Sequence, residues 1–129
     1  MEYYFSTILK SDFVETIAKV TEALKTEGFG IVSEIDMQVR LKEKLGVDFK
    51  PYKILGACNP AYAYKTLQQE EKIGVMLPCN VVVIGKENGT TEVAAVHPLA
   101  SMMAVQNPAL EPLASEITAK LKRVVDLLG

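Results

Sequence analysis

The chain contains two cysteines, Cys58 and Cys79, and each is followed directly by an asparagine, in the segments ILGACNP and LPCNVVV. Asn59 and Pro60 form a helix-start pattern, so Cys58 stands just before a helix. The partial positive charge of a helix start favours a thiolate there. Cys58 is therefore a candidate nucleophile or redox group. The alternative is that both cysteines are small buried core residues, which is common for free cysteine.

The cysteines do not form a metal-binding pattern. The chain has no CxxC spacing, and a site made from Cys58, Cys79 and His97 would be one ligand short of a closed zinc site. We therefore expect no metal and no cofactor. Both cysteines are predicted to be free thiols, because structural disulfides are rare in the reducing cytoplasm in which we expect this chain to reside.

His97 is the only histidine and is the natural candidate for a general base. The alternative is that a neighbouring amide, Asn80, satisfies its ring. The chain has no nucleophile-elbow glycine pattern and no phosphate-cradling loop, so motifs of hydrolases and nucleotide-binding proteins are missing. The sequence leaves open whether the chain is an enzyme.

Asp36 is the remaining candidate, and it belongs to the segment FGIVSEIDM. Strict alternation along a strand predicts that Ile31 and Ile35 share one face. Glu34 and Asp36 would lie about 7 Å apart on the other face, a spacing that could suit acid and base work. The alternative is that these carboxylates face solvent and that Asp36 caps the helix that follows it.

The composition indicates one folded domain, which we expect to span residues 1–129. Hydrophobic residues make up 49% of the chain and charged residues 23%, the ordinary globular balance. The net charge is −2 with no basic stripe, so no nucleic-acid partner is expected. The start MEYYFSTILKSD lacks a signal-peptide pattern, and the most apolar window is too short to cross a bilayer. We therefore expect a cytoplasmic protein without a membrane partner.

The expected elements follow the order β-α-β-α-β-α-β-β-α. Strand patterns cover residues 3–9, FGIVSEIDM, YKILGAC and the two β-branched runs around Asn88-Gly89. Capping residues mark the main helices, at Asp12 to Gly28, Asp36 to Gly46, Asn59 to about Lys72, and from about Pro112 onward. This order predicts an α+β fold in which helices pack on one face of a largely antiparallel sheet.

The hairpin around Asn88-Gly89 also predicts a register. This pair is favoured in two-residue turns. Counting outward from such a turn, Asn80 faces His97 and both project from one face of the sheet. Cys79 faces Pro98 and points to the other face. A shift of one residue would reverse the prediction for one strand relative to the other.

The assembled pattern resembles the family catalogued as domain of unknown function 302. The features that carry the resemblance are GFGIVSEIDM, LKEKLGVDFKPYKILGACNP, Ala63, Leu67, GVMLPCNVVV, and His97-Pro98 with the terminal helix. The resemblance covers nearly the whole chain. It implies a TATA-binding-protein-like fold, a curved antiparallel sheet with helices on its concave side, often dimeric. It also implies that the two Cys-Asn dipeptides meet. The position of His97 is often acidic in that family, which weakens a catalytic role for it.

Two asparagines that converge beside Cys58 would either hold the strand ends together by hydrogen bonds or orient a small ligand. The candidate ligand-binding residues are therefore Cys58, Asn59, Cys79, Asn80, His97 and Asp36. The sequence predicts a domain that binds a small-molecule ligand or a partner and self-associates as a homodimer, with aromatic residues of its first strand at the interface. The alternative is a thiol-dependent enzyme or redox sensor that uses Cys58.

Overall fold

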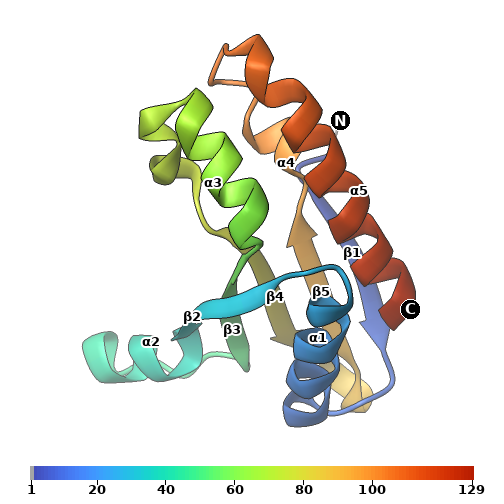
Figure 1. Cartoon of the computed structure of the whole chain (residues 1–129). Coiled ribbons are helices and arrows are strands. Elements are labelled where there is room, and N and C mark those ends of the chain that lie inside the picture. Colours follow the sequence, from blue (N-terminus) through green and yellow to red (C-terminus); the bar gives the residue numbers. More distant parts are fainter. Residues whose placement is uncertain (1) are drawn as a thin grey trace.

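The structure is a computed structural model that describes residues 2–129. Its centre is a five-stranded open sheet with the strand order β1-β5-β4-β3-β2, in which all neighbouring strands are antiparallel (Figure 1). The strands are β1 (Tyr4–Leu9), β2 (Gly30–Asp36), β3 (Tyr52–Cys58), β4 (Cys79–Gly85) and β5 (Thr91–Val96). The predicted fold class, α+β with a largely antiparallel sheet, is confirmed.

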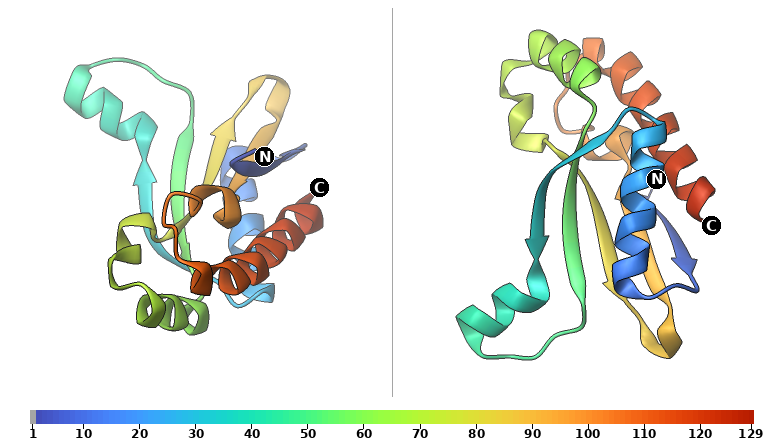
Figure 2. Two further views of the ribbon diagram at one scale, coloured as in Figure 1. Left: turned by 90° about the horizontal axis from the view of Figure 1, so that it is seen from above. Right: turned by 60° about the horizontal axis from the view of Figure 1, so that its bottom comes forward.

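The helices are α1 (Phe13–Thr26), α2 (Met37–Leu45), α3 (Pro60–Gln69), α4 (Pro98–Ser101) and α5 (Glu111–Leu128). Three short 3-10 segments lie in the connections, η1 (Glu71–Met76) between α3 and β4, η2 (Glu87–Gly89) between β4 and β5, and η3 (Pro108–Leu110) before α5. The helices α1, α3 and α5 lie on one side of the sheet, whereas α2 projects from the far end of β2 (Figure 2). In the described residues 2–129, no helix is long and apolar enough to span a membrane.

Local sequence signals set the ends of the first two helices, as predicted. Asp12 accepts a hydrogen bond from the backbone N–H of Glu15 at 2.7 Å, and Asp36 accepts one from Val39 at 3.0 Å. Gly46 ends α2 in the left-handed conformation, with φ of 69°. These caps satisfy backbone groups that a helix end leaves unpaired.

The hydrophobic core lies between the sheet and the helices α1 and α5. Alternate residues of the central strands point into it, and they meet one stripe of each helix. The fully buried members include Val20, Leu24, Leu55, Val81, Val83, Val93, Ala95, Leu121 and Val124. Because these residues alternate along each strand, the residues between them face the other side of the sheet.

The β4–β5 hairpin differs from its predicted register by one residue. Its loop has three residues, Glu87–Gly89, because the Lys86 N–H donates to the Thr90 carbonyl at 3.0 Å. Val81 therefore pairs with Ala95, which sets Asn80 opposite Val96. The predicted pairing of Asn80 with His97 is wrong.

This register confirms one of the two predictions about which residues share a face and contradicts the other. Cys79 and Asn80 lie on opposite faces of β4, as predicted. His97 lies in step with buried Ala95 and so follows the helix-side face, the face of Cys79.

Strand β2 contains a β-bulge at Val32. Ile31 pairs with Ala57, whereas Ser33 already pairs with Gly56. The extra residue reverses the facing of everything after it. Ile31 therefore packs on the helix side, while Ile35 lies on the opposite face, so the prediction that these two residues share a face is wrong.

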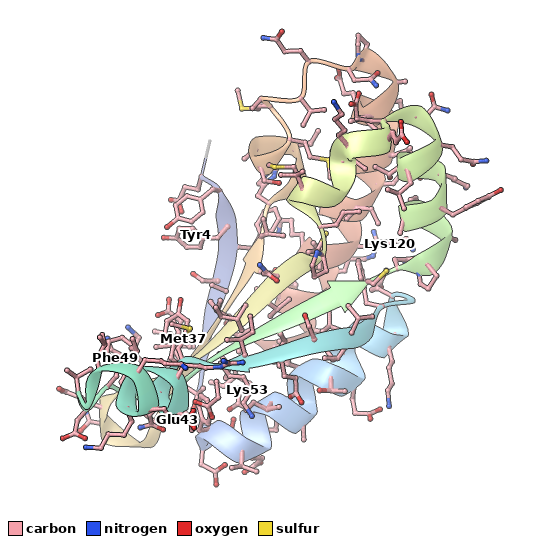
Figure 3. The ribbon with its side chains drawn as sticks, turned by 90° about the vertical axis from the view of Figure 1, so that its left-hand side faces the viewer. Tyr4, Met37, Glu43, Phe49, Lys53 and Lys120 are labelled. Carbon is pink, nitrogen blue, oxygen red and sulfur yellow. The ribbon has the colours of Figure 1, made fainter. Side chains whose placement is uncertain are left out.

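The opposite face of the sheet carries apolar side chains but none of the helices α1, α3 and α5. By the strand register, this open face contains Tyr4, Ile8, Ile35, Tyr52, Ile54, Val82, Ile84, Ala94 and Val96. Figure 3 shows the side chains of Tyr4 and Met37 on this side, with Lys120 of α5 on the other. The helix α2, which begins at Met37, has no buried residue.

Candidate functional site

Both cysteines line one cavity, at the end of the sheet where β3 leads into α3 and β4 begins. Its volume is about 250 Å³, and its wall comes from β2, β3, α3, the start of β4 and α5. Cys58 ends β3 and Cys79 begins β4, next to each other because Ala57 and Cys79 are paired. Asn59, at the start of α3, lines the same cavity.

The cavity changes the chemistry of Cys79. Burial, with a smaller contribution from the neighbouring Cys58, raises the pKa of this thiol to about 11. Burial has this effect because a low-dielectric environment disfavours the thiolate. Cys79 is therefore a neutral thiol at physiological pH. Both cysteines are free.

Asn59 performs a task that its sequence position did not indicate. The helix α3 begins at Pro60, as predicted, but the Asn59 side chain makes no capping hydrogen bond. Its Nδ2 donates instead to the backbone carbonyl of Glu27, at the end of α1, at 3.1 Å. The predicted cap is thus wrong, and Asn59 joins the start of α3 to the end of α1.

Glu27 makes this junction three-way, because its side chain reaches α5. Its Oε1 accepts from Arg123 Nη2 at 3.0 Å and lies 3.8 Å from Lys120 Nζ. The hydrogen bond from Arg123 is the main reason why the pKa of Glu27 lies below its usual value. One residue therefore links the end of α1 to α3 and α5, the two long helices that line the cysteine cavity.

Asn80 lies outside this cavity, because it is on the open face of β4. There it lines a second hollow, of about 380 Å³, together with Tyr4, Tyr52 and Val82. The structure therefore brings Cys58, Asn59 and Cys79 together and does not place Asn80 with them. The prediction that the two asparagines converge beside Cys58 is therefore wrong.

His97 and Asp36 are also away from the cavity lining. His97 precedes α4, where its Nδ1 accepts from the Ala100 N–H at 3.4 Å, and its ring stacks on Phe5 with 4.7 Å between centroids. Asp36 lies at the other end of β2 and caps α2. Within residues 2–129, no three His, Cys, Asp or Glu side chains are grouped so that they could hold a metal ion.

Comparison with known proteins gives a family. The family model described as "Domain of unknown function DUF302" matches residues 5–128. The chain belongs to the DUF302 family. A crystal structure described as an uncharacterized conserved protein DUF302 from Bacillus stearothermophilus is similar to this one with a TM-score of 0.91. The two sequences are 33% identical, and the match covers 100% of each chain. No curated protein matches the chain.

Several residues that line this DUF302 cavity were not among the predicted site residues. Tyr62 and Thr66 lie four residues apart on α3 and therefore share one helix face, which the spacing alone could have shown. The nearby Glu116 carboxylate raises the pKa of the Tyr62 phenol, and Lys120 Nζ lies 5.7 Å from its ring centroid. Met102, which follows α4, completes the wall from a distant part of the chain.

Proposed function

We propose that this DUF302 domain is a binding domain whose partner is a second copy of itself, held by α2 and the open sheet face. The observation that carries this proposal is that α2 has no buried residue. Apolar side chains are nevertheless exposed on α2 and the segment after it, with Leu45 at 68%, Val39 at 49% and Phe49 at 40%. In proteins, helices are stabilised chiefly by packing an apolar face, and within one chain only Met37 and Leu41 of α2 are even half-buried.

The open sheet face offers a continuous apolar surface to a partner. Ala94, Val82, Ile54 and Ile35 are cross-strand neighbours in one row over four strands. Tyr4 and Tyr52 flank the hollow on this face. Contiguous apolar patches of this kind mark interaction sites, and tyrosine is enriched at the core of interfaces.

Charge favours a second copy as the occupant. Residues 37–53, which we call the arm, contain five basic and two acidic side chains, a net charge of +3. Since the whole chain carries −2, the rest of it carries −5. Glu2 and Glu92 lie near Tyr4 at the β1 side of the open face. A twofold arrangement would bring each basic arm to the acidic side of the other copy.

Sedimentation equilibrium at micromolar concentration tests the proposal. We expect the mass of two chains for the wild type, with a buried area above about 1,000 Å² in total. Val39→Glu and Leu45→Glu place a carboxylate in the interface and should give one-chain masses. Val14→Glu is the matched control, because Val14 is 78% exposed on α1, on the other side of the sheet.

Two outcomes would contradict this assignment. A one-chain mass for the wild type at every concentration would exclude the dimer. A dimer that Val14→Glu weakens as much as Val39→Glu does would exclude the arm as its interface.

Thiol-dependent catalysis by Cys58 has less support. Among the described residues that line the cavity there is no Asp, Glu, His, Lys or Arg to act as a base or to stabilise a thiolate. The neighbouring thiol, Cys79, is itself held neutral. The free thiols do support the cytoplasmic location that we propose.

A further inference from the structure

We propose that the cavity beside Cys58 and Cys79 is a binding site for a small, uncharged, mostly apolar molecule with about ten non-hydrogen atoms. This site is separate from the proposed dimer interface, because it lies among α3, α5 and the strand ends, whereas the arm and the open face lie on the other side of the sheet. The inference therefore goes beyond the self-association proposed above.

The size of the cavity defines the size of the ligand. Protein interiors are close-packed and contain few voids larger than a water molecule. A dry, enclosed cavity of about 150 Å³ takes up benzene; the cavity here is larger, about 250 Å³, and it opens to the surface beside the exposed Val32. A fused two-ring compound fits this volume better than a single ring does.

The lining defines the polarity of the ligand. Phe29, Ala57 and Ile117 supply apolar walls, and no charged side chain is among the described lining residues. A charged ligand would lose its hydration without gaining an ion pair, which is costly. The two thiols are only weakly polar and pack against apolar groups. The raised pKa of Cys79 fits this description, since it reports a poorly hydrated wall.

One side chain could orient such a ligand. Asn59 donates one of its two amide N–H groups to the Glu27 carbonyl, which leaves the second N–H and the amide oxygen without a partner among the described residues of the fold. Thr66 is already used, because its hydroxyl donates to the Tyr62 carbonyl at 2.7 Å. A ligand with a single N–H or O–H donor therefore suits the Asn59 end of the cavity.

Methyl NMR with indole as the probe tests this site, because indole has two fused rings and one N–H. The chain has five methionines, and Met102 lines the cavity. In protein labelled with ¹³C at the methionine methyl groups, we expect a saturable shift of the Met102 signal. Met37, on the arm, serves as the internal control and should not shift. Indole-3-acetate has the same rings with a carboxylate and should bind at least about tenfold more weakly.

A matched pair of variants locates the binding. Ala63 lines the cavity, whereas Ala61 is exposed two residues earlier on the same helix. Ala63→Leu should abolish the Met102 shift, and Ala61→Leu should preserve it. Ala63→Val, which adds less volume, is the second filling variant in case Ala63→Leu does not fold.

The following results would overturn the proposal. Met102 could fail to shift at millimolar indole, or Met37 could shift in parallel with it. Binding that persists unchanged in the folded Ala63 variants would place indole elsewhere. Because Val39→Glu should bind indole like the wild type, failure of the dimer and failure of this site are distinguishable.

Discussion

Cys79 is the side chain whose chemistry the fold alters most. Its pKa rises to about 11 from an ordinary value of 9.0, and burial is the main cause. The unfolded chain therefore releases this proton at a lower pH than the folded chain does. Stability from this group is complete below about pH 9 and is lost as the pH rises towards 11.

Unfolding in urea between about pH 7 and pH 10.5 should show this loss. A shift of about two units corresponds to about 2–3 kcal/mol in full. Cys79→Ala removes the titrating group, so its free energy of unfolding should fall less steeply with pH than that of the wild type. Lysines and tyrosines titrate in both proteins, so the contribution of Cys79 is the difference between the two slopes of unfolding free energy against pH. Parallel curves would show that Cys79 is not buried as described.

Asn59 offers a second test at this scale, because its two interpretations predict different variants. If Asn59 acts through the hydrogen bond from its Nδ2 to the Glu27 carbonyl, Asn59→Ala should lower the free energy of unfolding by about 1 kcal/mol, the usual net value of one hydrogen bond. Asn59→Asp should lose at least as much, since a carboxylate faces a carbonyl oxygen. Aspartate is a good helix cap, so a wild-type urea midpoint for Asn59→Asp would restore the capping role.

The sequence around Asn59 predicted where α3 begins but not what the side chain does. The start follows from Asn-Pro, a local signal that needs no knowledge of the fold. The actual partner, Glu27, is 32 positions away, and only the packing of α1 against the strand ends brings it close. In the same way, the two Cys-Asn dipeptides are visible in the sequence, but the two cysteines share one cavity only because β3 pairs with β4.

Gly56 is the clearest example of packing at the level of whole elements. It lies on β3, the strand next to the edge strand β2, where the bulge in β2 and the loop before β4 close over it. A Cβ at this position would lie 2.7 Å from Pro78 Cγ and would also overlap the Ser33 side chain. The Ser33 side chain can rotate, whereas the proline ring cannot move without its backbone.

Gly56→Ala should therefore destabilise the protein by about 1–3 kcal/mol, the typical cost of overpacking. Gly30→Ala is the matched control, because Gly30 is also a strand glycine and a Cβ there would meet nothing within 4 Å. Its free energy of unfolding should stay at or above the wild-type value. Equal urea midpoints for Gly56→Ala and the wild type would mean that β2 and the β4 loop do not close over β3.

The elements themselves were predictable, whereas their registers were not. Alternation and caps are properties of a few neighbouring residues, so strands and helices appeared where expected. The hairpin register depends on whether the turn has two or three residues, and Asn88-Gly89 is compatible with both, since Asn88 also adopts a positive φ of 61°. The bulge at Val32 leaves no local signal, because an exposed valine fits a regular strand equally well.

At the scale of the whole molecule, the two sides of the sheet are unequal. The helix side holds the buried core and the cysteine cavity, whereas the other side holds an apolar surface and an arm without buried residues. Composition and element order predicted the α+β fold because they reflect the whole chain. The charge separation between the arm and the rest was not apparent from a net charge of −2, since it emerges only when the arm is seen to project (Figure 1).

If the second copy covers the open face, unfolding must depend on protein concentration, because dissociation and unfolding are then coupled. We expect one urea transition, as for a single domain of residues 1–129, with a midpoint that rises with concentration. Each tenfold increase in concentration should add about 1.4 kcal/mol per dimer. Val39→Glu should unfold at a concentration-independent midpoint, and Val14→Glu should behave like the wild type. A fixed wild-type midpoint would leave the open face to a different partner, and two transitions would show that the helix side and the arm side are separate folding units.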